Sequence, residues 1–371
     1  MLSTNSLARV LHCARRDNGA IPFDVFVGES LYGQNGFYQK RVSIGNEAGD
    51  AFCTHAENPL FTELIARHAF PCLRELGGPS LRFLELGGGM GSLKKRFKEL
   101  KYRAGVDFSY LSLDISKRLI DFQKRWGKDN IQASAISLPL ADRSIRGVIF
   151  ANELFDALPF KVVRAVKNKD QNLFQGVEEL YYVLDKQNEI QAEWRPVEPN
   201  SPINNYWERQ QRYFQSIGRN LDDELENGRV FCINLYEETL LRELNRVLAQ
   251  GEIIIIDYGD ELDKTLNDKG VFDLRMYPKK HEVKLEQAHQ SVYLADLTTD
   301  VNFTNLMLLA EELDLETSYQ TQSSFMKSQL TREEETMIVN PLADHPWHEY
   351  DEVLTKDEKE DVFKVLILRK G

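Results

Sequence analysis

The chain has 371 residues, of which 42% are hydrophobic and 28% are charged, a composition typical of a globular protein and unlike that of a disordered or fibrous one. Its 46 Lys and Arg against 58 Asp and Glu give a formal net charge of -12, which disfavours nucleic acid as the partner. The longest apolar runs, such as 253–256, fall far short of the roughly 20 residues that a membrane helix needs, so no membrane span is expected.

The N-terminus and the cysteines bear on the compartment. Residues 1–16 contain three arginines and no acid, which resembles an organelle transit peptide, although an amphipathic helix is the simpler interpretation. No CxxC pair occurs, so we expect reduced thiols rather than a disulfide scaffold or a zinc knuckle at Cys13, Cys53, Cys72 and Cys232. A cytoplasmic location is expected, with the mitochondrial matrix as the alternative in a eukaryote.

Strand and helix patterns alternate from residue 81 onward. Largely apolar strands are predicted at 81–86, 108–113, 145–151, 253–256 and 362–368. Amphipathic helices are predicted at 92–100, around Leu119 and Phe122, at 240–248 and around 303–313. Apolar strands that alternate with helices are typical of a parallel sheet covered on both faces, so the sequence predicts a doubly wound, Rossmann-like α/β fold.

The surplus length predicts additions to this core. We expect an N-terminal helical or cap segment at 1–75 and a main domain at 76–371, with insertions at about 160–240 and 260–300. About a hundred residues separate the strand at 145–151 from the strand at 253–256, more than one crossover helix requires. A further strand is predicted inside the first insertion, at 180–184.

A glycine-rich turn follows the first predicted strand. Its glycines Gly87, Gly89 and Gly91 would let the backbone approach a ligand and present N–H groups at the start of a helix. A dinucleotide fingerprint would need glycine where Ser92 stands, and a P-loop would need its lysine closer to the last glycine than Lys94. Both nucleotide interpretations are weakened, and a plain tight turn remains the structural alternative.

The turn also carries Glu85 before its glycines, and the next predicted strand ends on Asp114. This E-x-G-x-G-x-G pattern with a second-strand acid resembles the S-adenosylmethionine site of class I methyltransferases. The resemblance implies a mostly parallel seven-stranded sheet, S-adenosyl-L-methionine as cofactor, and ribose hydroxyls that donate to Asp114. The adenine edge would be formed by Ser134, Ala135 and Ile136, with Ser134 where many members have Asp, and Asn152 is also expected to bind the cofactor.

A more specific likeness lies at 152–159. These residues read Asn-Glu-Leu-Phe-Asp-Ala-Leu-Pro, which resembles a motif of the MidA-type methyltransferases, a family that includes a mitochondrial complex I assembly enzyme that dimethylates an arginine. Further likenesses to that family lie at 31–38, 49–54, 256–259, 274–277 and 296–304. The sequence departs from the family pattern on the expected acceptor side, at 55–57, at Asp273 and at 299–300.

Three carboxylates are the predicted catalytic residues. If the acceptor is an arginine, carboxylates can hold its guanidinium through paired hydrogen bonds. Glu153 and Asp156 would lie on one side of a helix that begins after Asn152, and Asp257 would end a strand at the same edge of the sheet. The alternative is that Asn152 only caps this helix and that the acids favour its first turn.

Other candidates have structural alternatives. Tyr258 either hydrogen-bonds a substrate or packs, and the aromatic residues Tyr206, Trp207 and Tyr213 either wall the pocket or belong to the core. His345 and His348 lack a third ligand, so no metal site is expected.

The leading hypothesis is a methyltransferase that uses S-adenosylmethionine to methylate a nitrogen of a protein arginine. One alternative is a tailoring O- or N-methyltransferase for a natural product or peptide. Another is a non-catalytic assembly factor that keeps the fold. The partner would be a protein or small-molecule methyl acceptor, and the oligomeric state stays open, with a homodimer as one option.

Overall fold

The computed structural model describes residues 19–40, 54–168, 174–186, 189–267, 274–277, 285–340, 352–355 and 362–371. The chain divides into two compact units of three segments each. The insertion unit contains Met1–Val42, Ala157–Glu237 and Asp260–Asn305, and the sheet unit contains Ser43–Asp156, Glu238–Gly259 and Leu306–Gly371. The predicted segment 1–75 therefore contributes to both units. Some of the sequence predictions concern residues that the structure does not describe, namely 1–16, Cys13, Cys53, Asp273, His345 and His348.

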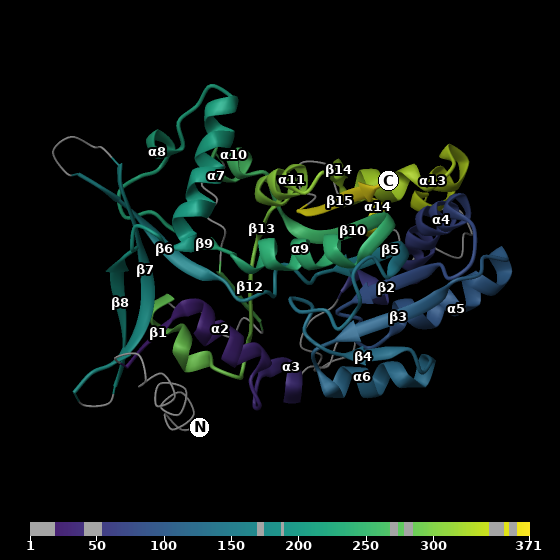
Figure 1. The fold of residues 1–371 in the computed structure, drawn as a ribbon, viewed down its shortest axis with the longest axis horizontal. Helices are drawn as coiled ribbons and strands as arrows, with labels where there is room; N and C mark the ends of the chain where they lie inside the picture. The colour runs from purple at the N-terminus through teal and green to yellow at the C-terminus, as the bar shows by residue number, and fades with distance from the viewer. Residues whose placement is uncertain are drawn as a thin grey trace. The chain divides into compact units, whose positions relative to one another are not determined.

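A mostly parallel sheet forms the centre of the sheet unit (Figure 1). Seven of its strands lie in the order β14-β15-β10-β5-β2-β3-β4. The pairs from β10 to β4 are parallel, whereas β15 is antiparallel to both of its neighbours. The bounds are β2 (Arg82–Leu86), β3 (Ser109–Asp114), β4 (Asn130–Gln132), β5 (Ile145–Asn152), β10 (Leu248–Asp260), β14 (Glu316–Thr321) and β15 (Phe363–Lys370). The predicted α/β fold and its main strands are confirmed.

The strand order fixes where a ligand can bind. The chain runs outward from β2 through β3 to β4, and then returns to β5 on the other side of β2. In open α/β sheets, ligands bind at the carboxyl ends of the strands where the order reverses. This switch point lies between β2 and β5, so the segments that follow these two strands are where the site is expected.

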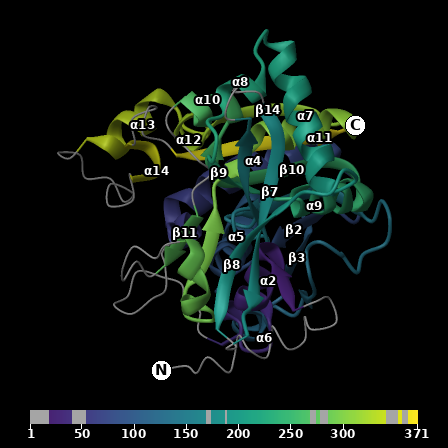
Figure 2. The ribbon, with the colours of Figure 1, turned by 90° about the vertical axis from the view of Figure 1, so that its left-hand side faces the viewer.

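Helices cover both faces of this sheet. The helices of the sheet unit are α4 (Pro59–Leu76), α5 (Ser92–Ala104), α6 (Lys117–Gln123), α9 (Tyr236–Val247), α11 (Phe303–Glu312), α12 (Gln322–Ser328), α13 (Arg332–Val339) and α14 (Glu352–Thr355), with 3-10 turns at His55–Glu57 and Lys124–Trp126. On one face, apolar side chains of α4, α5, α12, α13 and α14 pack on the strands in a single core cluster. Ile253 and Ile255 alternate with Ile254 and Ile256 of this cluster, so they are buried on the opposite face. The helices α9 and α11 lie on the other side of the strands from α12, α13 and α14 (Figure 2).

Local sequence explains where α4 begins. Asn58 is extended, and its side-chain oxygen accepts the N–H groups of Leu60 and Phe61, while Pro59 occupies the first helical position. The apolar residues of α4 then recur on the face that meets the sheet. Among the described helices, none is long and apolar enough to cross a membrane.

The insertion unit has its own antiparallel sheet, with strand order β1-β7-β6-β9 and β8 paired to β7. The paired strands β7 and β8 lie side by side in Figure 2. These strands are β1 (Ala20–Pro22), β6 (Lys161–Lys167), β7 (Phe174–Leu184), β8 (Ile190–Pro196) and β9 (Val230–Ile233). The strand predicted at 180–184 is the second half of β7. The rest of the unit comprises α2 (Phe23–Tyr32), α3 (Phe37–Lys40), α7 (Pro202–Ser216), α8 (Leu221–Glu224), α10 (Leu262–Asn267), β11 (Leu274–Tyr277), β12 (Asp296–Thr299), β13 (Val301–Asn302) and a 3-10 helix at Leu285–Ser291.

The core of the sheet unit is expected to be sensitive at Phe83. Its ring is fully buried, with its centroid 4.6 Å from that of Phe97 and 5.1 Å from that of Tyr110. Truncation leaves a cavity in a packed interior, so Phe83→Ala should lower the free energy of unfolding by about 3 to 5 kcal/mol. Chemical denaturation measures this change. The control is Tyr102→Ala on α5, where the side chain is 90% exposed and the expected change is within about 0.5 kcal/mol. Equal losses in the two variants would contradict this packing.

Candidate functional site

The predicted glycine loop lies at the switch point, between β2 and α5. Gly87, Gly89 and Gly91 have φ angles of 66°, 49° and 84°, in the left-handed region that favours glycine. A Cβ on Gly88 would lie 2.3 Å from the hydroxyl oxygen of Ser112, so no side chain fits there either. The loop therefore lies close against β3 and exposes backbone rather than side chains to a ligand.

A buried polar network supports the loop from below. Tyr110 donates to Glu85 (2.8 Å), and Ser112 donates to the Oε1 of Gln123 (2.7 Å). Gln123 in turn donates from its Nε2 to the carbonyl of Gly89 (3.0 Å). Sequence reasoning missed these supporting residues, for which the only local signal is Ser112 in a largely apolar strand. Glu85 is thus placed under the loop, and its contact with a cofactor stays a prediction.

Two carboxyls of this edge have raised pKa values. Burial raises the pKa of Glu85 to about 7, against the hydrogen bond from Tyr110 and the nearby charge of Lys94. Burial likewise raises the pKa of Asp114 to about 7, although the backbone N–H groups of Ser116 and Gly89 donate to it. Asp114 is only 6% exposed and joins the end of β3 to the glycine loop.

The predicted adenine segment begins beside Asp114. The N–H of Ala133 donates to the backbone carbonyl of Asp114 (3.0 Å), and Ser134, Ala135 and Ile136 follow as a partly exposed turn after β4. The structure therefore brings this segment, the glycine loop and Asp114 to the carboxyl ends of adjacent strands. Their roles in binding a cofactor stay predictions.

The prediction of a helix after Asn152 is wrong. Asn152 is the last residue of β5, and 153–160 form turns rather than a helix. One oxygen of Asp257 accepts the backbone N–H groups of Leu154, Phe155 and Asp156, at 3.2, 3.0 and 3.2 Å. Glu153 has a φ of 48°, a left-handed conformation that does not start a helix. The helix does not form because the carboxylate of Asp257, on the neighbouring strand β10, binds these N–H groups. The sequence around Asn152 gives no sign of this distant partner.

Glu153 is held by two side chains. Thr54 donates to its Oε1 (2.5 Å), and the Nδ2 of Asn152 donates to the same oxygen (3.1 Å). Burial raises the pKa of Glu153, and the hydrogen bond from Thr54 opposes this shift. The side-chain oxygen of Asn152 is buried and accepts no hydrogen bond from any described residue. It is an acceptor that a ligand could satisfy, at the end of the strand next to β2.

The other two predicted catalytic carboxylates are more deeply buried. Asp257 is 0% exposed, and burial raises its pKa well above the ordinary value, with the charges of Asp156 and Glu153 acting in the same direction. Asp156 is 5% exposed and accepts a hydrogen bond from the hydroxyl of Tyr258 at 2.5 Å. The structure thus gives Tyr258 a packing position and Asp257 a supporting one. Glu153 is half-buried as a whole residue, the least buried of the three, and all three catalytic roles stay predictions.

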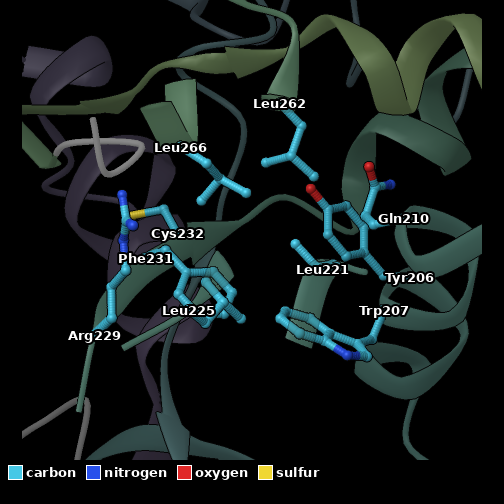
Figure 3. A pocket seen from close by; sticks show the side chains of 10 residues that line it. All are labelled: Tyr206, Trp207, Gln210, Leu221, Leu225, Arg229, Phe231, Cys232, Leu262 and Leu266. Carbon is cyan, nitrogen blue, oxygen red and sulfur yellow. The ribbon is translucent and has the colours of Figure 1, made fainter. Parts of the chain in front are cut away.

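The aromatic residues of α7 line a small cavity in the insertion unit. The cavity has a volume of about 20 Å³. Figure 3 shows Tyr206 and Trp207 beside Leu221, Leu225 and Phe231 around it. That volume holds about one water molecule. The Trp207 ring stacks on Phe174 with centroids 5.1 Å apart. These residues fill the interior of the unit, as the core alternative expects. The hydroxyl of Tyr213 lies 3.4 Å from Asp263.

The described residues contain no candidate metal site. In the part of the chain that the structure describes, no group of three His, Cys, Asp or Glu side chains could hold a metal ion. Cys72 is half-buried and Cys232 is buried, and neither forms a disulfide.

The fold and the glycine loop define a class I methyltransferase. A family model described as "Putative S-adenosyl-L-methionine-dependent methyltransferase" matches residues 64–321, more than half of the chain. The chain belongs to this family. It is an enzyme of the methyltransferase class, and S-adenosyl-L-methionine is its cofactor.

Two solved structures share the fold. One is a Burkholderia thailandensis protein described as a "likely methyl transferase" and bound to S-adenosylhomocysteine, with 20% identity over 99% of this chain and 92% of that chain and a TM-score of 0.77. The other is an uncharacterized protein from the same organism, with 20% identity, the same coverage and a TM-score of 0.75. No curated protein matches the chain.

Cofactor affinity is expected to depend on pH through Asp114. Ribose hydroxyls would donate to its ionised form, and its pKa is about 7. The affinity for S-adenosylhomocysteine should therefore rise about tenfold between pH 6 and pH 8, as measured by calorimetry. Asp114→Asn should weaken binding and remove the pH dependence. Glu85→Gln is the matched control, since this second carboxyl with a raised pKa lies under the loop, and it should keep the dependence. Wild-type affinity that does not change with pH would refute this role of Asp114.

Proposed function

We propose that the protein methylates a nitrogen of an arginine side chain in a protein substrate. The observation that carries the proposal is the position of Glu153, a half-buried residue whose carboxylate Thr54 and Asn152 hold at the carboxyl end of β5. The likeness of 152–159 to the MidA-type motif supports the same acceptor. A guanidinium is a planar cation, and a carboxylate in a fixed position is its natural partner.

The residues at the switch point fit the cofactor. The loop backbone at Gly88 lies so close to β3 that no side chain fits there. Asp114 would accept the ribose hydroxyls, and the buried side-chain oxygen of Asn152 would accept a donor that the protein itself does not supply. The cofactor supplies an electrophilic methyl group on a sulfonium, so the protein's task is to align the acceptor nitrogen and manage its proton.

Glu153 is suited to both parts of that task. Its ionised form would pair with the guanidinium and orient one nitrogen. A guanidinium nitrogen loses a proton when it gains a methyl group, and the raised pKa of Glu153 makes this carboxylate a better acceptor of that proton than an ordinary glutamate. The three N–H groups bound to Asp257 hold the backbone after Glu153 in place. Asp257 would therefore act by positioning.

The test uses labelled S-adenosylmethionine and an extract of the source organism. We expect label in a protein band and, after digestion, methylarginine by mass spectrometry. Glu153→Gln should reduce transfer by at least about 100-fold, since it removes the base and the charge, and should leave the affinity for S-adenosylhomocysteine unchanged. Asp107→Asn, at an exposed acid on the same unit, is the control and should retain full transfer.

Other outcomes separate the alternatives. Label in a small molecule or a peptide, with none in protein, would replace the arginine acceptor with the tailoring reaction. Cofactor binding without any labelled product would favour the assembly factor. Label on a residue other than arginine would contradict the proposed acceptor.

A further inference from the structure

The turn after β4 presents a row of backbone donors. Among the described residues, nothing accepts a hydrogen bond from the N–H groups of Ser134, Ala135 or Ile136, and each of these residues is partly exposed. The flanking N–H groups are used, since Ala133 donates to Asp114 (3.0 Å) and Ser137 donates to Ser134 (3.3 Å). Three successive donors are thus left for a ligand at the edge of the sheet where the cofactor site is expected.

Two side chains of α9 hold the other end of this turn. Arg246 donates from Nη2 to the carbonyl of Leu138 (3.0 Å) and from Nη1 to the carbonyl of Leu140 (2.9 Å). Glu243 accepts the N–H of Leu138 (2.8 Å). Both polar groups of the Leu138 backbone are therefore bound by one helix, although more than 100 residues separate them from it in the sequence.

Glu243 and Arg246, which we call the clamp, are also bonded to each other. The guanidinium of Arg246 makes two bonds of 2.8 Å to the carboxylate of Glu243, and it also bonds Asp142 (2.6 Å). The backbone carbonyl of Arg246 accepts the N–H of Arg143 (2.8 Å). The neighbouring face of α9 is anchored in the interior by Leu240, Leu244 and Val247, all 0% exposed. Because Arg246 makes two hydrogen bonds to Glu243 and lies on a packed helix, its guanidinium holds the turn in one fixed geometry.

We propose that Arg246 and Glu243 are positioning residues for the purine base of the cofactor. They fix the turn so that its free N–H groups meet the acceptor nitrogens of adenine. Ser134 has no carboxylate with which to bind the exocyclic amine, so recognition of the base depends on the backbone of the turn. The inference rests on the use of S-adenosylmethionine and not on the identity of the methyl acceptor.

The first test is calorimetric binding of S-adenosylhomocysteine to the full chain. Arg246→Ala removes the hydrogen bonds to both carbonyls, so the Kd should rise on the order of tenfold. Arg242→Ala is the matched control, because Arg242 lies one turn earlier on α9 and pairs with Glu238 on the exposed side. It should leave the Kd unchanged. An unchanged Kd in Arg246→Ala would overturn the proposal.

The second test separates positioning of the base from general stability. Adenine presents an acceptor at N1, whereas hypoxanthine presents a donor there, so a row of N–H groups should favour S-adenosylhomocysteine over S-inosylhomocysteine. This preference should fall in Arg246→Ala and persist in Arg242→Ala. Equal losses for both ligands would show a merely structural role and overturn the proposal. If Arg246→Ala does not fold, Glu243→Gln carries the same comparison, because it weakens the pair without removing either side chain.

Discussion

The segment expected on the acceptor side of the site depends on one carboxylate. Asp257, fully buried near the end of β10, takes three successive backbone N–H groups of the segment that follows β5. These bonds replace a helix with a tight loop and leave Glu153 in a left-handed conformation, where Thr54 and Asn152 can hold its carboxylate. The same loop lies close to the glycine loop, since Leu154 lies 3.1 Å from where a Cβ on Gly87 would be.

The two sides of the switch point are supported independently. The glycine loop rests on β3 and α6 through Ser112, Gln123 and Asp114, whereas the loop after β5 rests on β10 through Asp257. The parallel sheet thus carries two loops, each held by its own buried polar residues. In open α/β folds the sheet provides a fixed scaffold, and the loops at its edge provide the residues of the site. Substitutions of the anchors should separate cofactor binding from methyl transfer.

The sequence predicted what short-range patterns encode. The apolar strands at 81–86 and 253–256 and the glycine loop stand out by periodicity and spacing, and the structure contains them. The helix after Asn152 failed because its competitor, Asp257, lies 101 to 103 residues away from the N–H groups it binds. The clamp at Arg246 is equally non-local. Most strands of the insertion unit were not predicted. The strand β8 shows the reason, since it mixes charged and apolar residues and none of its residues is fully buried.

Hydrogen exchange of the backbone from 153 to 160 tests the central claim most directly. In the wild type, the N–H groups of Leu154, Phe155 and Asp156 should be protected, because each donates to Asp257. In Asp257→Ala this protection should be lost, while the strand β2 stays protected and S-adenosylhomocysteine still binds. Equal protection of these three amides in both proteins would contradict the account.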